Sequence, residues 1–330
     1  MTGPADLRAR RSDSTRRSRR PPRPAAVIAA ALLGQLAAAC SSPGATGETT
    51  APARGESALD AAAAMAADAQ RETAPGPAAL DGPAGDAGAP PGPVPPGAHP
   101  VPTRYVVLGD SIVACLGVGD KNAATCGPKK LHAYLAAGIA PGITYENLAI
   151  SGANTADVPA RELAGVTGGA GHLLVLIYVG GNDLRPYLAG LDAAAEAGFA
   201  KVVPEIEAEW KKVFDFFADR SKFPGGATLL MNNQYDPFDD CTAAPYFISA
   251  TKHALLRSYN DVLAKLARDN GAVLTEQYLP YLGHGHHWAV ATCPHYKAGS
   301  TPFMNDLIHP NPAGHEHLFA QWKQVLGALY

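Results

Sequence analysis

Short apolar runs alternate with longer amphipathic segments from about residue 103 to the end of the chain. A short apolar run bounded by turn residues is typical of a buried strand, whereas apolar residues at every third or fourth position are typical of a helix. The runs are YVVLG (105–109), ITYENLAI (143–150), HLLVLIYVGG (172–181), ATLLMNN (227–233) and GAVLTEQ (271–277). Strands that alternate with helices predict an α/β domain, with a central, mostly parallel five-stranded sheet and helices on both of its faces.

The segments between and after these runs carry the predicted helices. They are KKLHAYLAAG (129–138), ADVPARELAG (156–165) and the stretches 189–220, 247–271 and 312–330. Pro204 lies inside the stretch 189–220, so we expect one or two helices there, with the proline at a break or in a first turn. Gly271 is expected to end the helix before it, and Pro312 lies near the start of the last helix.

The first 40 residues have the layout of an export signal. A basic segment ends at Arg23 and is followed by the apolar stretch AAVIAAALLGQLAAA. This stretch is shorter than the roughly 20 residues that span a bilayer as a helix, and small residues then lead to Cys40. The tripeptide Ala38-Ala39-Cys40 resembles a bacterial lipobox, although Leu36 lies one position further from the cysteine than is usual. We therefore expect a signal peptide over 1–40 and a lipid anchor on Cys40 that holds the exported protein at the cell envelope; secretion after ordinary cleavage is the alternative.

Residues 41–102 are rich in Ala, Gly and Pro and contain no aromatic residue. Such a segment cannot bury enough apolar surface to offset the entropy lost on ordering, so we expect a disordered linker before a folded domain over 103–330.

The whole chain has a net charge of −3, and its first 40 residues hold eight Arg against two Asp. The rest is therefore acidic, which argues against nucleic acid as a partner. We expect the domain to be a monomer.

Four cysteines lie within the predicted domain: Cys115, Cys126, Cys241 and Cys293. An even number of cysteines in an exported domain predicts two disulfides, for which three pairings exist. We favour Cys115–Cys126 with Cys241–Cys293, because the first two cysteines are close in sequence. The second bridge would then join the two longest loops at one edge of the sheet.

Polar residues follow the predicted strands at the places where functional groups gather in a parallel sheet. Ser111 follows the first strand, Gly152 follows the second, Asn182 follows the third, and Asp306 with His309 precedes the last helix. A serine hydroxyl becomes a nucleophile when a histidine takes its proton and a carboxylate orients that histidine. Backbone N–H groups and an asparagine amide suit the stabilisation of a developing oxyanion. These residue types together predict acyl transfer.

The same residues resemble the four blocks of the SGNH, or GDSL, hydrolases. The blocks are GDS (109–111), Gly152, GGND (180–183) and DLIH (306–309), in the family's order. The resemblance covers 103–330 and implies a flavodoxin-like three-layer α/β/α fold, hydrolysis of esters, and no metal or cofactor. It implies Ser111 as nucleophile, His309 as general base and Asp306 as the residue that orients it. It also implies an oxyanion hole formed by the N–H groups of Ser111 and Gly152 and by the Asn182 side chain.

Other known catalytic and metal-binding motifs are absent from this sequence or incomplete in it. No G-x-S-x-G elbow is present, and the SATK segment at 249–252 lies inside a predicted helix without the motifs that accompany S-x-x-K. Histidines at 284, 286, 287 and 295 lack the spacing of a zinc motif. The favoured function is an esterase or lipase that acts through an acyl-enzyme on a small-molecule, lipid or glycan ester. The alternatives are a carbohydrate O-deacetylase, an acyltransferase on the same site, and a non-catalytic surface lipoprotein that only binds.

Overall fold

A computed structural model describes residues 99–188 and 190–330 of the protein. The predicted signal peptide (1–40), Cys40 and the predicted linker as far as residue 98 lie outside the described residues. Within the described ranges, none of the helices combines the length and the apolar character needed to cross a bilayer.

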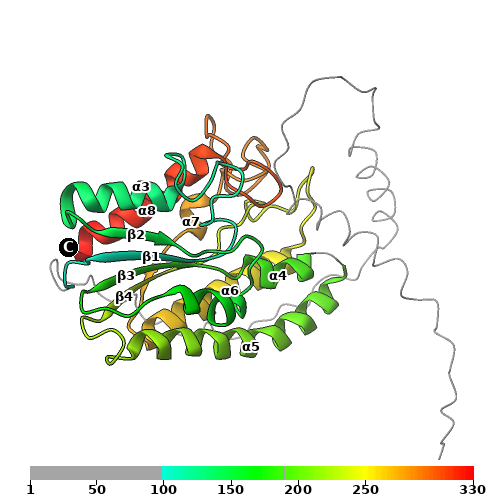
Figure 1. Cartoon of the computed structure of the whole chain (residues 1–330). Helices are drawn as coiled ribbons and strands as arrows, with labels where there is room; N and C mark the ends of the chain where they lie inside the picture. Colours follow the sequence, from blue (N-terminus) through cyan, green and yellow to red (C-terminus); the bar gives the residue numbers. More distant parts are fainter. Residues whose placement is uncertain (1–98, 189) are drawn as a thin grey trace, which may run out of the picture. The chain divides into compact units, whose positions relative to one another are not determined.

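Five parallel strands form the central sheet, in the order β2-β1-β3-β4-β5 (Figure 1). They are β1 (Arg104–Gly109), β2 (Thr144–Asn147), β3 (Leu173–Tyr178), β4 (Ala227–Asn232) and β5 (Val273–Thr275). This order is that of the flavodoxin-like fold. Each strand falls within or beside one of the apolar runs, which confirms the predicted fold class.

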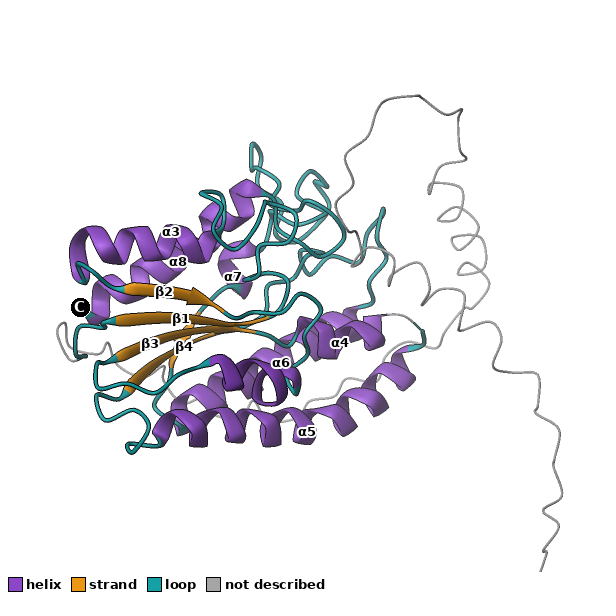
Figure 2. Cartoon of the chain, in the orientation of Figure 1, coloured by secondary structure: helices purple, strands orange, loops and turns teal. Residues whose placement is uncertain are grey.

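Helices cover both faces of the sheet and make three layers (Figures 1 and 2). One face carries α3 (Gly127–Tyr134), its π-helical continuation η2 (Leu135–Ile139) and α8 (Pro312–Leu329). The other face carries α4 (Gly181–Leu188), α5 (Asp192–Ala218) and α6 (Ala250–Asp269). Successive residues of β1 alternate between two cores: Val106 packs with the α5 and α6 side, and Val107 packs with the α3 and α8 side. The two-residue period of a strand thus builds both interfaces at once.

Two predicted helical segments differ in detail from the expectation: Pro204 marks neither a break nor a first turn, and 156–165 is helical but not α-helical. Helix α5 runs through Pro204 without a break. The proline removes one backbone hydrogen bond, which destabilises the helix. The burial of Ile206, Trp210 and Val213 in one core offsets that loss of stability. The segment 156–165 forms two short turns of other helix types, η3 (Val158–Glu162) and η4 (Leu163–Gly165), instead of an α-helix.

The loops beyond the carboxyl edge are held together by both predicted disulfides. Cys115–Cys126 and Cys241–Cys293 are each bridged across a Cα–Cα distance of 5.4 Å. The Asp239 carboxylate joins the same two loops, because it accepts hydrogen bonds from the backbone N–H groups of residues 283, 284, 285 and 287. This segment also contains the short helix α7 (Tyr278–Tyr281), which the sequence patterns did not predict. The two longest loops are therefore one cross-linked unit.

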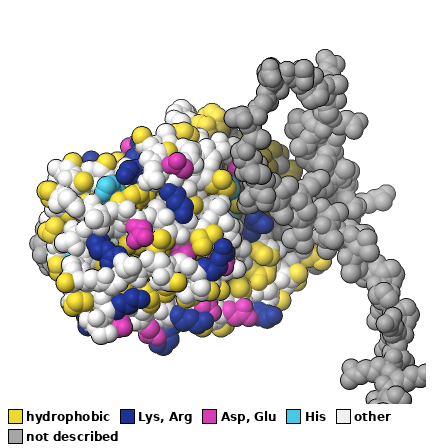
Figure 3. Space-filling view, in the orientation of Figure 1, with side chains coloured by type: hydrophobic (Ala, Val, Ile, Leu, Met, Phe, Trp, Pro, Cys, Tyr) yellow, Lys and Arg dark blue, Asp and Glu magenta, His cyan; other side chains and the backbone are white. Residues whose placement is uncertain are grey.

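The visible surface of the domain carries charges of both signs. Figure 3 shows Lys and Arg interspersed with Asp and Glu over the described part of this face. Several of these charges form i,i+4 pairs along helices, such as Lys211 with Asp215 and Lys265 with Asp269. Exposed pairs of this kind contribute little to stability, because water and salt screen them.

Candidate active site

Ser111 lies just beyond the end of β1, and the last residue of that strand is a glycine with a positive φ. Gly109 has a φ of +130°, and a Cβ atom placed there would come within 2.0 Å of the Tyr178 carbonyl oxygen on β3. Only glycine allows the two strands to approach so closely before the chain turns. The turn leaves the Ser111 side chain 4% exposed, at the edge where β1 and β3 diverge. The chain continues from β1 to α3 on one face of the sheet and from β3 to α4 on the other face. A crevice therefore opens between the ends of these two strands.

His309 reaches Ser111 from the far end of the sequence. Its Nε2 atom lies 2.9 Å from the Ser111 Oγ atom. Its Nδ1 atom lies 2.9 Å and 2.8 Å from the two carboxylate oxygens of Asp306. A carboxylate accepts hydrogen bonds, so Nδ1 carries the proton in the neutral ring and Nε2 is left to accept from the hydroxyl. The structure thus joins the three predicted residues in one hydrogen-bonded chain.

Asp306 remains ionised in this arrangement. Its partial burial acts to raise the carboxyl pKa, but the N–H groups of Ile308 and His309 and the His309 ring outweigh that effect, and the net pKa lies below its ordinary value. The backbone N–H groups of Ile308 and His309 lie 3.0 Å and 2.8 Å from Asp306 Oδ1. Tyr235 adds a further restraint, because its hydroxyl donates to the Ile308 carbonyl. The loop that carries His309 is therefore fixed on both sides.

The predicted oxyanion donors lie in two adjacent turns and a helix start. No backbone acceptor is found for the N–H groups of Ser111 and Gly152 within the described ranges. Gly152 has a φ of +83°, which favours glycine at that position. The Asn182 amide donates to the Ala153 carbonyl at 2.8 Å, which joins the start of α4 to the Gly152 turn. Asn182 lines the same cleft as Ser111, whereas Gly152 is not among the lining residues.

Asp183 and Asp110, the acidic neighbours of two site residues, have structural contacts. Asp183 Oδ2 accepts from the Thr155 N–H at 2.9 Å and from its hydroxyl at 3.1 Å. Asp110 Oδ1 accepts from the Ile112 N–H at 2.9 Å, which closes the turn around Ser111. Burial raises the pKa of Asp110 to about 7, and the Asp183 charge adds to this. Asn182 and Asp183 are in the first turn of α4, where the sequence suggested only a polar turn.

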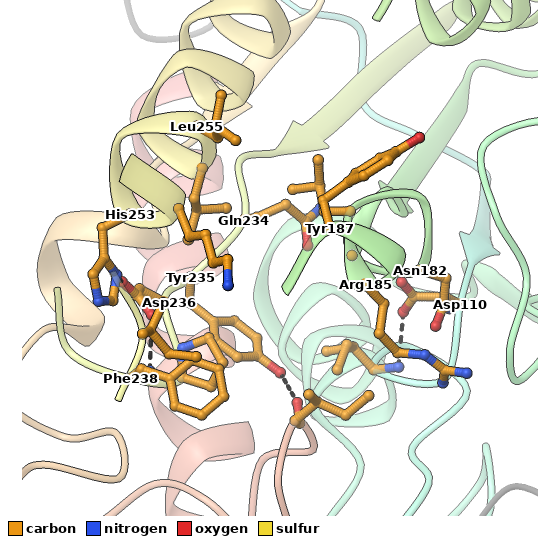
Figure 4. A pocket seen from close by; sticks show the side chains of 18 of the residues that line it. Asp110, Asn182, Arg185, Tyr187, Gln234, Tyr235, Asp236, Phe238, His253 and Leu255 are labelled. Atoms are coloured by element: carbon orange, nitrogen blue, oxygen red, sulfur yellow. Dashed lines mark hydrogen bonds and ion pairs between the residues drawn. The ribbon is translucent and has the colours of Figure 1, made fainter. Parts of the chain in front are cut away.

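An apolar cleft runs from Ser111 between α4 and α6. Figure 4 shows Tyr187 and Arg185 on one side, Leu255 and His253 on the opposite side, and Tyr235 between them. Away from Ser111, its apolar lining includes Leu184, Tyr187, Phe199, Ile248, Leu255 and Leu256. Sequence reasoning missed these residues, because three helices and a loop contribute them. Tyr235 and Phe238, from the loop after β4, also line the cleft.

Three titratable groups beside the cleft come within metal-ligating distance of one another. Asp236, Asp240 and His253 are the one such group found in the described part of the chain. Each is already engaged: His253 Nδ1 lies 2.6 Å from Asp236 Oδ2, and Arg257 lies 2.6 Å from Asp240. Burial acts to lower the pKa of His253, but the hydrogen bond to Asp236 and the charges of Asp236 and Asp240 together outweigh it, and the net pKa is raised. We interpret this cluster as an ion-pair network that fixes α6 against the loop after β4.

Glu162 is a further buried acid that the sequence analysis overlooked. Its side chain is 2% exposed, and it accepts a 2.7 Å hydrogen bond from the Gly109 N–H. A signal existed: Val158 and Val166 lie four residues before and after Glu162, at helical spacing, and both are buried. An acidic residue on an apolar face indicates a specific partner.

A flavodoxin-like sheet with serine, histidine and aspartate joined beyond its carboxyl edge defines a class of hydrolases that lack the nucleophile elbow. The family model of the GDSL-like lipase/acylhydrolase family matches residues 107–317, and the chain belongs to this family. This confirms the resemblance to SGNH/GDSL hydrolases and places the protein among the ester hydrolases.

Individual proteins are similar to this chain. A lipase from Streptomyces rimosus is 29% identical over 197 residues, which cover 55% of this chain and 72% of that protein. The crystal structure of an extracellular lipase from Streptomyces rimosus is 24% identical, with a TM-score of 0.49 over 69% of this chain and 100% of its own. The crystal structure of a phospholipase A1 from Streptomyces albidoflavus is 19% identical, with a TM-score of 0.47 over 69% and 100% of the two chains.

Proposed function

We propose that this protein hydrolyses carboxylic esters through an acyl-enzyme on Ser111. The observation that carries the proposal is the hydrogen-bonded chain from Ser111 Oγ through the His309 ring to Asp306. His309 Nε2 takes the hydroxyl proton as Ser111 Oγ attacks the ester carbonyl carbon. The ionised Asp306 stabilises the imidazolium that forms and keeps the ring oriented.

The negative charge that develops on the carbonyl oxygen needs donors that are already in place. The N–H groups of Ser111 and Gly152 and the second amide proton of Asn182 supply these donors in our proposal. The imidazolium then gives its proton to the leaving alcohol, and the acyl group remains on Ser111. A water molecule, activated by the neutral His309, attacks the acyl-enzyme and releases the acid.

The apolar cleft is our argument that the acyl group transferred to Ser111 is longer than acetyl. It leads away from Ser111 between apolar side chains of α4, α5 and α6. Each methylene removed from water stabilises the bound ester by about 0.8 kcal/mol. This favours an esterase or lipase over a carbohydrate O-deacetylase, because an acetyl group would leave the far part of the cleft empty. An acyltransferase would use the same cleft and differ only in the acceptor.

A series of p-nitrophenyl esters from acetate to dodecanoate tests the proposal and the role of the cleft. We expect kcat/KM to rise with chain length beyond acetate. Leu255→Trp places a larger side chain in the cleft and is expected to lower the decanoate-to-butyrate ratio of kcat/KM by roughly tenfold. Leu279→Trp is the matched control, since Leu279 is 64% exposed and does not line the cleft.

An optimum at acetate, together with activity on acetylated xylan, would instead support the deacetylase. Transfer of the acyl group to an added alcohol in preference to water would support the acyltransferase. If no ester is hydrolysed, the result would support the alternative of a non-catalytic surface lipoprotein.

We also propose that the protein is exported and held at the membrane through a lipid on Cys40. The basic and apolar segments before Cys40 support this, as do the two disulfides of the domain, which are typical of exported proteins. Expressed in a bacterium fed an alkyne fatty acid, the wild-type protein is expected to become labelled and Cys40→Ser to remain unlabelled. Equal labelling of both proteins, or none of either, would contradict the lipid anchor.

A further inference from the structure

Glu162 lies behind the nucleophile turn. Its Oε2 atom accepts from the N–H of Gly109, two residues before Ser111, and its side chain is almost fully buried. Its Oε1 atom is also buried and has no hydrogen-bond partner within the described ranges. The catalytic steps proposed above do not use this group.

The bond from Gly109 replaces a missing contact in the sheet. β2 pairs with β1 only as far as Val107 and Asn147, and then its chain leaves toward the Gly152 turn. The Gly109 carbonyl still accepts from the Ile150 N–H at 2.8 Å. Glu162 satisfies the Gly109 N–H where the ladder ends. One residue, Gly109, therefore connects Glu162 to both turns that carry the proposed oxyanion N–H groups.

The surroundings of Glu162 favour its neutral form. Burial raises the pKa of Glu162 to about 8, the N–H groups of Gly109 and Ile150 oppose this rise, and the Asp110 carboxylate adds to it. Lys121, from the loop before α3, acts in the opposite direction. Asp183 of α4 acts on Asp110 and so affects Glu162 indirectly. A neutral carboxylic acid at this position accepts the Gly109 N–H without placing a charge behind Ser111.

We propose that Glu162 is a positioning residue: as a neutral acid it holds the Ser111 and Gly152 turns in place, and its ionisation in alkaline solution weakens catalysis. The proposal rests on the proposed ester hydrolysis. A negative charge on Glu162 would oppose the oxyanion that forms on the other side of the turn, where little water screens it. The effect falls on kcat more than on KM, because the opposed charge exists in the transition state and not in the bound ester.

Glu162→Gln separates the hydrogen bond from the charge. The amide oxygen still accepts from Gly109, and the side chain does not ionise. With p-nitrophenyl butyrate, we expect the wild-type kcat to fall about threefold or more between pH 8 and 9.5, while the profile of Glu162→Gln stays level over that range. Glu146→Gln is the matched control, because it removes an exposed carboxylate on β2 and should retain the wild-type decline.

Glu162→Leu removes the acceptor as well, and its kcat is expected to lie at least about tenfold below that of Glu162→Gln at pH 7. If this variant does not fold, the comparison of wild type with Glu162→Gln still decides the question. An alkaline decline that is the same in both proteins would overturn the inference about Glu162 while leaving ester hydrolysis intact. A wild-type protein without esterase activity would overturn the proposed function instead.

Discussion

Replacing Ser111 with alanine is expected to lower kcat/KM for ester hydrolysis by roughly 10,000-fold or more. The substitution removes the one hydroxyl that lies 2.9 Å from His309 Nε2. The remaining oxyanion donors and the apolar cleft would still bind substrate, so KM should change far less than kcat. Initial rates with p-nitrophenyl butyrate measure both constants.

Ser151→Ala is the matched control for that experiment. Ser151 lies in the exposed turn next to Gly152, and a change there removes a hydroxyl of the same kind. Its activity should stay within a few-fold of wild type. If Ser111→Ala retained more than about a hundredth of wild-type kcat/KM while Ser151→Ala lost activity, Ser111 would not be the nucleophile.

Gly109→Ala is expected to destabilise the domain by about 3 kcal/mol or more, or to prevent soluble expression. The new Cβ atom would overlap the Tyr178 carbonyl oxygen at 2.0 Å, and the φ of +130° is one that alanine rarely adopts. Neither strain can relax easily, because β1 and β3 are paired along their whole length at the centre of the sheet. For a domain of this size, the loss corresponds to a fall in Tm of roughly 6–12 °C.

Gly142→Ala separates steric overlap from backbone strain. Gly142 also has a positive φ, +83°, but nothing lies within 4 Å of the position its Cβ would take. Its cost should be about 1 kcal/mol. A Tm for Gly109→Ala equal to or above that of Gly142→Ala would mean that the close approach of β1 and β3 is not as the structure has it.

The sequence was most informative where one local pattern determines one element. Each apolar run became or contained most of a strand, and the polar residues that follow the first and third strands meet because β1 and β3 are neighbours. The pairing of the cysteines was also predicted correctly. Parallel topology alone brings Ser111 and Asn182 to one edge, whatever the intervening helices do.

What the sequence did not predict depends on packing between distant segments. The helix through Pro204 persists because Trp210 and its neighbours are buried, and local propensity does not show that. The cleft is assembled from residues of α4, α5 and α6 that share no sequence pattern. Glu162 was overlooked because its partner, the Gly109 N–H, is a backbone group 53 positions away.

Covalent trapping tests the central claim most directly. A fluorophosphonate reacts with an activated serine hydroxyl, loses fluoride and leaves a stable phosphonyl ester on the oxygen. We predict one adduct per chain on the wild-type domain, located by peptide mass spectrometry at Ser111. Ser111→Ala should acquire none, and His309→Ala should react far more slowly. An adduct on a different serine, or ester hydrolysis by a wild-type protein that the probe never labels, would contradict the account.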